Sequence, residues 1–132
     1  MLNRVPLFGG VSKRGMKEIA KIADEIDLPA GKELIREGDP GRQFFVLLDG
    51  EAEVRRKGRK VNTLGAGDFF GEMALIDGEP RSATVVAVSD VYVMTITRAK
   101  FLKLLESEPK IALAIMATLT RRLRDVQAAA SL

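Results

Sequence analysis

The chain has 132 residues, of which 46% are hydrophobic and 30% are charged, and its net charge is +3. This length and balance predict a single soluble globular domain over residues 1–132. There is no cysteine and no histidine, which excludes disulfides and removes the usual ligands of zinc, haem and iron–sulfur sites, so we expect no metal and a cytoplasmic location. No apolar run approaches the roughly 20 residues that span a bilayer, so we expect no membrane insertion.

The predicted elements begin with a helix over residues 13–24, where Met16, Ile19 and Ala20 recur at helical spacing. From residue 25 to 97, short β-branched and apolar runs alternate with glycine turns, a pattern that predicts a sandwich or barrel. The expected strands are 25–28, 33–36, 43–49, 52–56, 60–64, 83–88 and 91–97.

After Thr97 the apolar period becomes helical. Thr97 is predicted to cap a helix over 98–106, and Pro109 is expected to open a second helix over about 110–129. On that second helix a heptad seam is formed by Ala112, Met116, Leu119, Leu123, Val126 and Ala130. Two interpretations stay open, because such a stripe serves equally for pairing with another helix or for packing against the chain's own strands.

The basic residues gather in two clusters, residues 55–60 and residues 121–124. The first is predicted to be a hairpin tip and the second a helix face. With one tyrosine, no tryptophan and no recognition-helix motif, these clusters are better explained as solvated charge than as a nucleic-acid site. We therefore expect no direct DNA binding by this chain.

The most informative segment is residues 70–85, which begins Phe-Gly-Glu and ends Arg-Ser-Ala-Thr-Val. Gly71 leads into a short helical turn, where unpaired backbone N–H groups attract an anion. Arg81 offers a planar fork of donors for two phosphate oxygens, whereas an ionised Glu72 only accepts hydrogen bonds and so suits hydroxyls. Together they predict a site for a ribose phosphate. The alternative is a surface ion pair of Glu72 with Arg81 beside an ordinary turn.

This segment resembles the phosphate-binding cassette of cyclic nucleotide-binding domains, and residues 70–85 are called the cassette below. The family includes bacterial catabolite activators, regulatory subunits of cyclic-AMP-dependent protein kinase, and cyclic-nucleotide-gated channels. The resemblance covers nearly the whole chain, through Gly31, Gly38, the apolar run 45–48, Gly50 and residues 67–70. It implies a mainly β fold with flanking helices: a jelly-roll (double-stranded β-helix) barrel at about 25–97, an N-terminal helix, and two C-terminal helices at about 98–129.

The resemblance also implies roles for individual residues. Glu72 would accept from the ribose 2′-OH, Arg81 with the backbone N–H groups of Met73 and Ala74 would hold the cyclic phosphate, and the second C-terminal helix would enclose the base. The predicted ligand-binding residues are Gly71, Glu72, Met73, Ala74, Arg81, Ser82, Ala83, Val61 and Val126. Catabolite activators have hydroxyls near the positions of Val126 and Gln127, and this chain departs from that pattern. Serine after the cassette arginine accompanies cyclic AMP preference in catabolite activators, so we expect cyclic AMP to bind at least as well as cyclic GMP, with only modest discrimination between the two.

The sequence therefore predicts a cyclic nucleotide-binding regulatory domain with no catalytic residues and no cofactor besides its ligand. Leu75 is expected to couple the cassette to the C-terminal helices through Phe101 or Leu105. The expected partners are the nucleotide and either a second copy, paired through the last helix, or an effector domain elsewhere. One rival is an interaction module without ligand, which an intact Glu72 and Arg81 argue against. The other is a barrel phosphodiesterase, for which we find no metal cluster or acid–base pair.

Overall fold

The computed structural model describes residues 5–130, and the side chains of residues 5–128. Its helices are the 3₁₀ helix η2 (Pro6–Phe8), α1 (Lys13–Ile22), α2 (Glu72–Asp77), α3 (Arg98–Ser107) and α4 (Pro109–Ala130). Its strands are β1 (Asp24–Leu28), β2 (Glu33–Ile35), β3 (Gln43–Asp49), β4 (Ala52–Arg56), β5 (Arg59–Leu64), β6 (Phe69–Phe70), β7 (Thr84–Ala87) and β8 (Val91–Thr97). Every predicted helix and strand is present, with ends that differ by at most two residues; η2 and β6 were not predicted.

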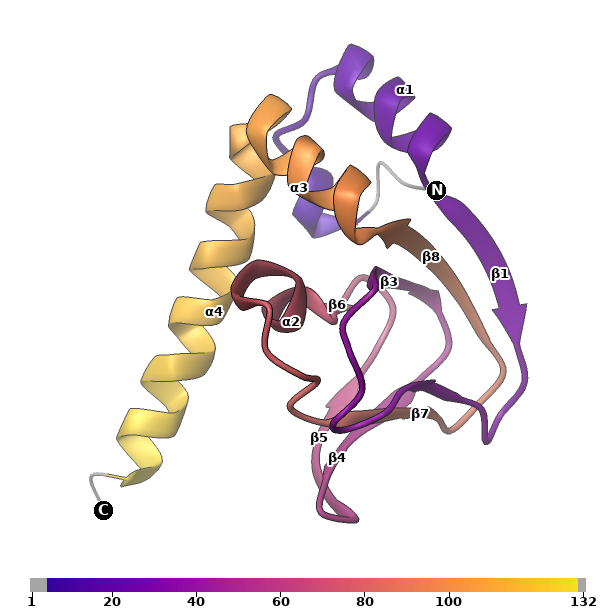
Figure 1. Cartoon of the computed structure of the whole chain (residues 1–132), viewed down its shortest axis with the longest axis vertical. Coiled ribbons are helices and arrows are strands. Elements are labelled where there is room, and N and C mark those ends of the chain that lie inside the picture. The colour runs from indigo at the N-terminus through magenta and orange to yellow at the C-terminus, as the bar shows by residue number, and fades with distance from the viewer. Residues whose placement is uncertain (1–4, 131–132) are drawn as a thin grey trace.

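The strands form two antiparallel sheets of four, in the orders β1-β8-β3-β6 and β2-β7-β4-β5. Apart from the hairpin β4–β5, the chain changes sheet between every two consecutive strands. This repeated crossing gives two facing sheets of the jelly-roll type, with the helices gathered on one side (Figure 1). The predicted fold class is confirmed.

Strand β3 is buried on both faces, and this explains its continuous apolar run. Phe45 and Leu47 point between the two sheets, and Phe44 and Val46 point toward the helices. The core between the sheets consists of Phe45, Leu47, Ala52, Leu64, Phe70, Val85, Ala87, Val91 and Val93. The side chains of β3 alternate between its two faces and thus join two cores, where an alternating polar and apolar strand would separate a core from solvent.

The helical layer packs on the outer face of β3 and β8. Ile19 of α1, Phe101 of α3 and Ile111 of α4 are fully buried there, and the rings of Phe44 and Phe101 stack with centroids 4.5 Å apart. At the start of α3, Thr97 occupies the N-cap position, as predicted, but its side chain makes no capping hydrogen bond. The helix is held by its buried face instead.

Helix α4 packs on the domain through its first half only. Ile111 and Ile115 are buried, whereas Met116, Leu123 and Val126 of the predicted seam are exposed. The side chain of Ala130, the last seam residue, lies outside the described residues. In Figure 1 the C-terminal half of α4 extends away from the strands. The buried stripe therefore starts one residue away from the predicted seam, at Ile111 and Ile115, and meets the seam at Leu119, which is partly buried against the same core. Within residues 5–130, no helix is long and apolar enough to cross a membrane.

Candidate functional site

Gly71 sets the geometry of the site, at the junction between β6 and α2. Its φ of 86° lies in the left-handed region that favours glycine. A Cβ at this position would lie 2.8 Å from Arg81 Nη1 and 3.2 Å from the carbonyl oxygen of Gln43. Both the backbone conformation and the close approach of Arg81 therefore require glycine here.

The guanidinium of Arg81 is fixed in place by backbone carbonyls. Its side chain is buried, with 6% exposure, and Nη1 donates to the Gly71 carbonyl at 2.6 Å while Nη2 donates to the Gln43 carbonyl at 2.7 Å. Burial lowers the pKa of Arg81, and the negative charge of Glu72 opposes that shift. These two bonds use two of the five N–H donors of an arginine and fix the plane of the group, so donors remain for an anion.

Glu72, at the first position of α2, is a buried carboxylate with 2% exposure. Its Oε1 accepts from Nη1 of Arg122, on α4, at 3.3 Å. Burial raises the pKa of Glu72, and its own backbone N–H and the charges of Arg122 and Arg81 oppose the rise. The alternative of a surface ion pair between Glu72 and Arg81 is wrong, because both are buried and the carboxylate pairs with Arg122. Residues 121–124 were predicted to carry purely solvated charge. This is wrong at Arg122, because its guanidinium pairs with the buried carboxylate of Glu72.

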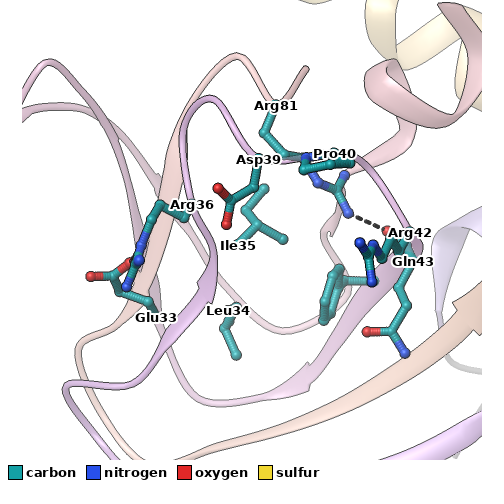
Figure 2. Close-up of a pocket in the computed structure, with 10 residues that line it drawn as sticks. Glu33, Leu34, Ile35, Arg36, Asp39, Pro40, Arg42, Gln43 and Arg81 are labelled. Carbon is teal, nitrogen blue, oxygen red and sulfur yellow. Dashed lines mark hydrogen bonds and ion pairs between the residues drawn. The ribbon is translucent and has the colours of Figure 1, made fainter. Parts of the chain in front are cut away.

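A cavity of about 470 Å³ opens beside Arg81 (Figure 2). Its wall is made of Glu33, Leu34, Ile35, Arg36, Asp39, Pro40, Arg42, Gln43, Phe45 and Arg81. All nine predicted site residues are described by the structure, and of these Arg81 alone lines this cavity. It therefore reaches Arg81 from the side of β2 and the loop after it, whereas Glu72 lies on the side of α4.

The other predicted site residues differ in their solvent exposure. Met73 and Ala74 form the first turn of α2, with Met73 exposed and Ala74 buried, while Ser82 is exposed and Ala83 is buried. Two further residues are at the surface: Val61 is 53% exposed and Val126 is 65% exposed. The structure thus brings Gly71, Glu72 and Arg81 together and leaves the predicted base contacts open to solvent.

Val61 lies at an irregularity of β5. The ladder with β4 pairs Asn62 with Val54 and Lys60 with Arg55, so Val61 is the extra residue between two pairs. Such bulges redirect a side chain and are frequent beside binding sites. The cue in the sequence is weak, because Val61 continues an ordinary strand pattern.

Sequence reasoning missed several groups that contact the cassette. Gln43 supplies a backbone carbonyl to Arg81, Arg56 donates through Nε to the carbonyl of Ser82 at 3.2 Å, and Arg122 pairs with Glu72. A carbonyl acceptor leaves no signal in a sequence. Arg56 and Arg122 were visible as members of the two basic clusters, but their partners are set by the tertiary fold.

Comparison with known proteins identifies the family. The model of the cyclic nucleotide-binding domain matches residues 25–108. The chain belongs to this family. It is 42% identical over 106 residues to a cAMP-dependent protein kinase regulatory subunit of Aspergillus niger, covering 79% of this chain and 26% of that protein. It is 40% identical over 118 residues to a cyclic nucleotide-gated potassium channel of Rhizobium etli, covering 89% of this chain and 33% of that protein.

Among solved structures, the catabolite activator protein of Thermus thermophilus is similar to this domain, with a TM-score of 0.86 and 31% identity. The likeness covers 96% of this chain and 62% of that one. The predicted resemblance to the catabolite activator and kinase regulatory-subunit types is thereby confirmed. This cyclic nucleotide-binding domain spans about a quarter to a third of the length of the curated relatives named above.

Proposed function

We propose that this domain binds cyclic AMP at least as tightly as cyclic GMP and acts as a regulatory domain without catalysis of its own. The observation that carries the proposal is the buried pair of unlike charges around Gly71. Glu72 and Arg81 are both almost fully buried, and burying ionised groups is costly unless they are paired and hydrogen-bonded. A cyclic nucleotide offers a hydroxyl for the first and an anion for the second.

The ligand would be held through complementary groups at its ribose and phosphate. Arg81 would donate to the cyclic phosphate, together with the backbone N–H groups of Met73 and Ala74 and the hydroxyl of Ser82. Glu72 would accept from the ribose 2′-OH. Gly71 precedes these residues in the sequence and Ala83 follows them, and both are small enough for a close approach of the ligand. A metal has no part in this scheme.

The proposal is tested by titrating the domain with cyclic AMP in a calorimeter, followed by mass spectrometry of the recovered nucleotide. Saturable binding with the nucleotide recovered unchanged supports a regulatory domain. Binding followed by conversion to AMP would identify a phosphodiesterase instead. A flat titration with both cyclic nucleotides would identify an interaction module that has lost its ligand.

The base is expected to contribute little discrimination. Val61 and Val126 are exposed and apolar, so they can cover the face of a purine but cannot distinguish adenine from guanine by hydrogen bonding. We predict that cyclic AMP binds at least as tightly as cyclic GMP. A competition assay measures this ratio directly, and a tenfold or greater preference for cyclic GMP, about 1.4 kcal/mol, would contradict the prediction.

The ribose 2′-hydroxyl is expected to contribute more to ligand discrimination than the base does. We predict that the domain binds 2′-deoxy cyclic AMP more weakly than cyclic AMP, and that Glu72→Gln narrows the difference. A hydrogen bond to an ionised group contributes about 1.5–3 kcal/mol, or roughly ten- to 150-fold in affinity. Calorimetric titration of both proteins with both ligands gives the ratio. Glu53→Gln, which removes a carboxylate from the ion pairs of β4 with Arg55 and Lys60, is the matched control. Equal affinity of the wild type for the two ligands would remove Glu72 from the site.

Regulation requires that the ligand contact two conformations differently. We assign the moving part to α3 and α4, which pack on the strands from one side only. The partner that reads this movement is a second copy of the chain or an effector domain, and the exposed Met116 and Leu123 of α4 offer the apolar surface for it. A cytoplasmic location, expected from the sequence, belongs to the same proposal.

A further inference from the structure

Two neighbouring cavities open at the side of the sandwich formed by β1 and β2. The first, of about 470 Å³, is the cavity beside Arg81, and the second has a volume of about 390 Å³. They join in one groove, called the edge groove below, because they share four lining residues: Glu33, Leu34, Gln43 and Phe45. β1 and β2 are end strands of the two sheets, and residues 5–130 contain no further strand that closes the sandwich here. Sites for small ligands measure roughly 300–1,000 Å³, so each cavity is large enough for one.

The inner face of β1 is left uncovered in the edge groove. In the antiparallel ladder Ile26 pairs with Val93 and Leu28 pairs with Val91, and both valines are buried between the two sheets. Directly paired side chains lie on the same face of a sheet, so Ile26 is on the inner face as well. It is nevertheless 46% exposed, and it lines the second cavity. A large apolar side chain of the sandwich interior is thus open to the groove.

An apolar floor runs along the edge groove. Leu34 and Phe45 line both cavities, and both belong to or pack against the core between the sheets. Ile35 continues this floor in the first cavity, and in Figure 2 it lies between Arg36 and Arg42. An apolar floor with a few charged groups at its rim is typical of a site for a molecule with an apolar body and a charged head.

The rim is positively charged at the end of the groove near the cassette. Arg42 and Arg81 both line this end, and Figure 2 shows them on the same side of the cavity. Arg42 is exposed, and among the side chains that the structure describes its guanidinium has no hydrogen-bond or ion-pair partner. The carboxylates of this end act on a third arginine: Glu33 accepts from Nε of Arg36 at 2.9 Å, and Glu33 and Asp39 together raise the pKa of Arg36. Arg42 and Arg81 therefore have donors left for an anion.

The opposite end of the edge groove has a different charge. The second cavity is lined by Asp24 and Glu25 of β1, and Lys32 is the cation on that side. An anionic group is therefore attracted to the arginine end and disfavoured at the β1 end. An elongated ligand with one anionic group would accordingly bind in a single orientation.

We propose that the edge groove is a second ligand site, for a small amphiphilic carboxylate whose head group binds Arg42 and Arg81 and whose apolar chain lies along Leu34 and Phe45 toward Ile26. A guanidinium matches a carboxylate in shape and charge, because it can donate two parallel hydrogen bonds to the two oxygens. The chain would cover Ile26, the side chain of the inner face that the sandwich leaves open. Of the nine residues predicted for the cyclic nucleotide, Arg81 alone lines this groove.

Arg81 connects the two sites, and this part of the inference rests on the proposed function. Two of its N–H donors are already bonded to the carbonyls of Gly71 and Gln43. If a carboxylate in the edge groove uses further donors and part of the positive charge, less remains for a cyclic phosphate. The two ligands should therefore weaken each other's binding, and by linkage each does so by the same factor.

The test uses octanoate, octanol and acetate as probes. Octanoate and octanol have the same chain with different head groups, and acetate has the carboxylate without the chain. Each probe is titrated into the wild type, Arg42→Gln, Ile26→Ser and Arg59→Gln, and amide and methyl resonances are followed by NMR. Arg59→Gln is the matched control, because it removes the same charge from an exposed residue of β5 that lines neither cavity. The wild type is also titrated with cyclic AMP, with and without saturating octanoate.

Octanoate is expected to shift the amide resonances of residues 24–28, 33–36 and 42–45 in a saturable manner, with nuclear Overhauser effects from its chain to the methyl groups of Ile26 and Leu34. Octanol and acetate should bind roughly tenfold more weakly or worse, because each lacks one of the two contacts. Arg42→Gln should lower the affinity for octanoate roughly three- to tenfold, since this arginine is exposed. Ile26→Ser should also lower it, and Arg59→Gln should behave as the wild type. Saturating octanoate should weaken the binding of cyclic AMP roughly threefold or more.

Several results would overturn the inference. Equal affinity for octanol and octanoate would mean that the groove is an apolar surface without an anion site. Octanoate shifts scattered outside the groove, or unchanged in Arg42→Gln, would mean that the chain binds without specificity. An unchanged affinity for cyclic AMP in saturating octanoate would refute the shared use of Arg81. The two proposals fail separately: a domain that binds cyclic AMP and not octanoate refutes the second site alone, and one that binds octanoate and neither cyclic nucleotide refutes the proposed function.

Discussion

Arg81→Ala is expected to lower the affinity for cyclic AMP about thirty- to several-thousand-fold while the domain stays folded. Truncating one member of a buried, hydrogen-bonded charge pair costs roughly 2–5 kcal/mol, which corresponds to that range. The variant also leaves the carbonyls of Gly71 and Gln43 without their donor. Each unsatisfied buried acceptor costs about 1–3 kcal/mol, less than the usual 5–15 kcal/mol stability of a domain.

The measurement is calorimetric titration, with circular dichroism to show that the fold is kept. Arg36→Ala is the matched control, because Arg36 lines the same cavity (Figure 2) but is exposed and pairs with Glu33. Arg81→Lys should bind poorly as well, since an ammonium cannot satisfy two carbonyls and a phosphate in one plane. Affinity of Arg81→Ala within threefold of the wild type would show that the phosphate is bound elsewhere.

The strands and helices were predictable where a local pattern determines them. The apolar run of β3 indicates a strand and the glycines at the turns mark strand ends, and neither signal requires knowledge of the partner strands. β6 was missed because it has only two residues, Phe69 and Phe70, and exists through its pairing with β3. The order of strands in each sheet likewise depends on contacts between distant segments, which no local pattern encodes.

The candidate site likewise combines residues that a local pattern reveals with a residue that only the tertiary fold brings in. Gly71, Glu72 and Arg81 lie within one short segment, so their spacing in the sequence reveals them. Arg122 comes from a helix 50 residues further along, and a helix has several faces that could be turned to the domain. The seam predicted for α4 comes from a regular apolar repeat, but the fully buried residues of the helix are Ile111 and Ile115, one residue away from it, and of the seam Leu119 is partly buried against the core. Periodicity identifies a helix and an apolar stripe, whereas the packed face depends on the surface that the helix meets.

Leu75 links the cassette to the C-terminal helices. This side chain is fully buried in α2 and belongs to the same core cluster as Phe101 of α3, one of its predicted partners. Leu105, the other, is partly buried against that cluster. A second link was not predicted: Arg98 Nε donates to the carbonyl oxygen of Leu75 at 3.2 Å. Leu75 thus connects the first residue of α3 and its buried face to the turn that follows Glu72.

Leu75→Ala is expected to lower the free energy of unfolding by about 2–5 kcal/mol, the range for removing a buried leucine side chain. It should also weaken the effect of ligand on the helices. With cyclic AMP, hydrogen exchange of the wild type should slow in residues 71–76 and in residues 110–126, because α3 and α4 pack on one side only and belong to the less stable part of the fold. In Leu75→Ala the protection of residues 110–126 should diminish more than the protection of residues 71–76.

Ile76→Ala is the matched control, because Ile76 is the next residue of α2 and is 51% exposed, so the protection of both segments should stay near that of the wild type. Protection confined to residues 71–76 in the wild type would mean that the domain binds nucleotide without moving its helices, and that α3 and α4 take no part in regulation.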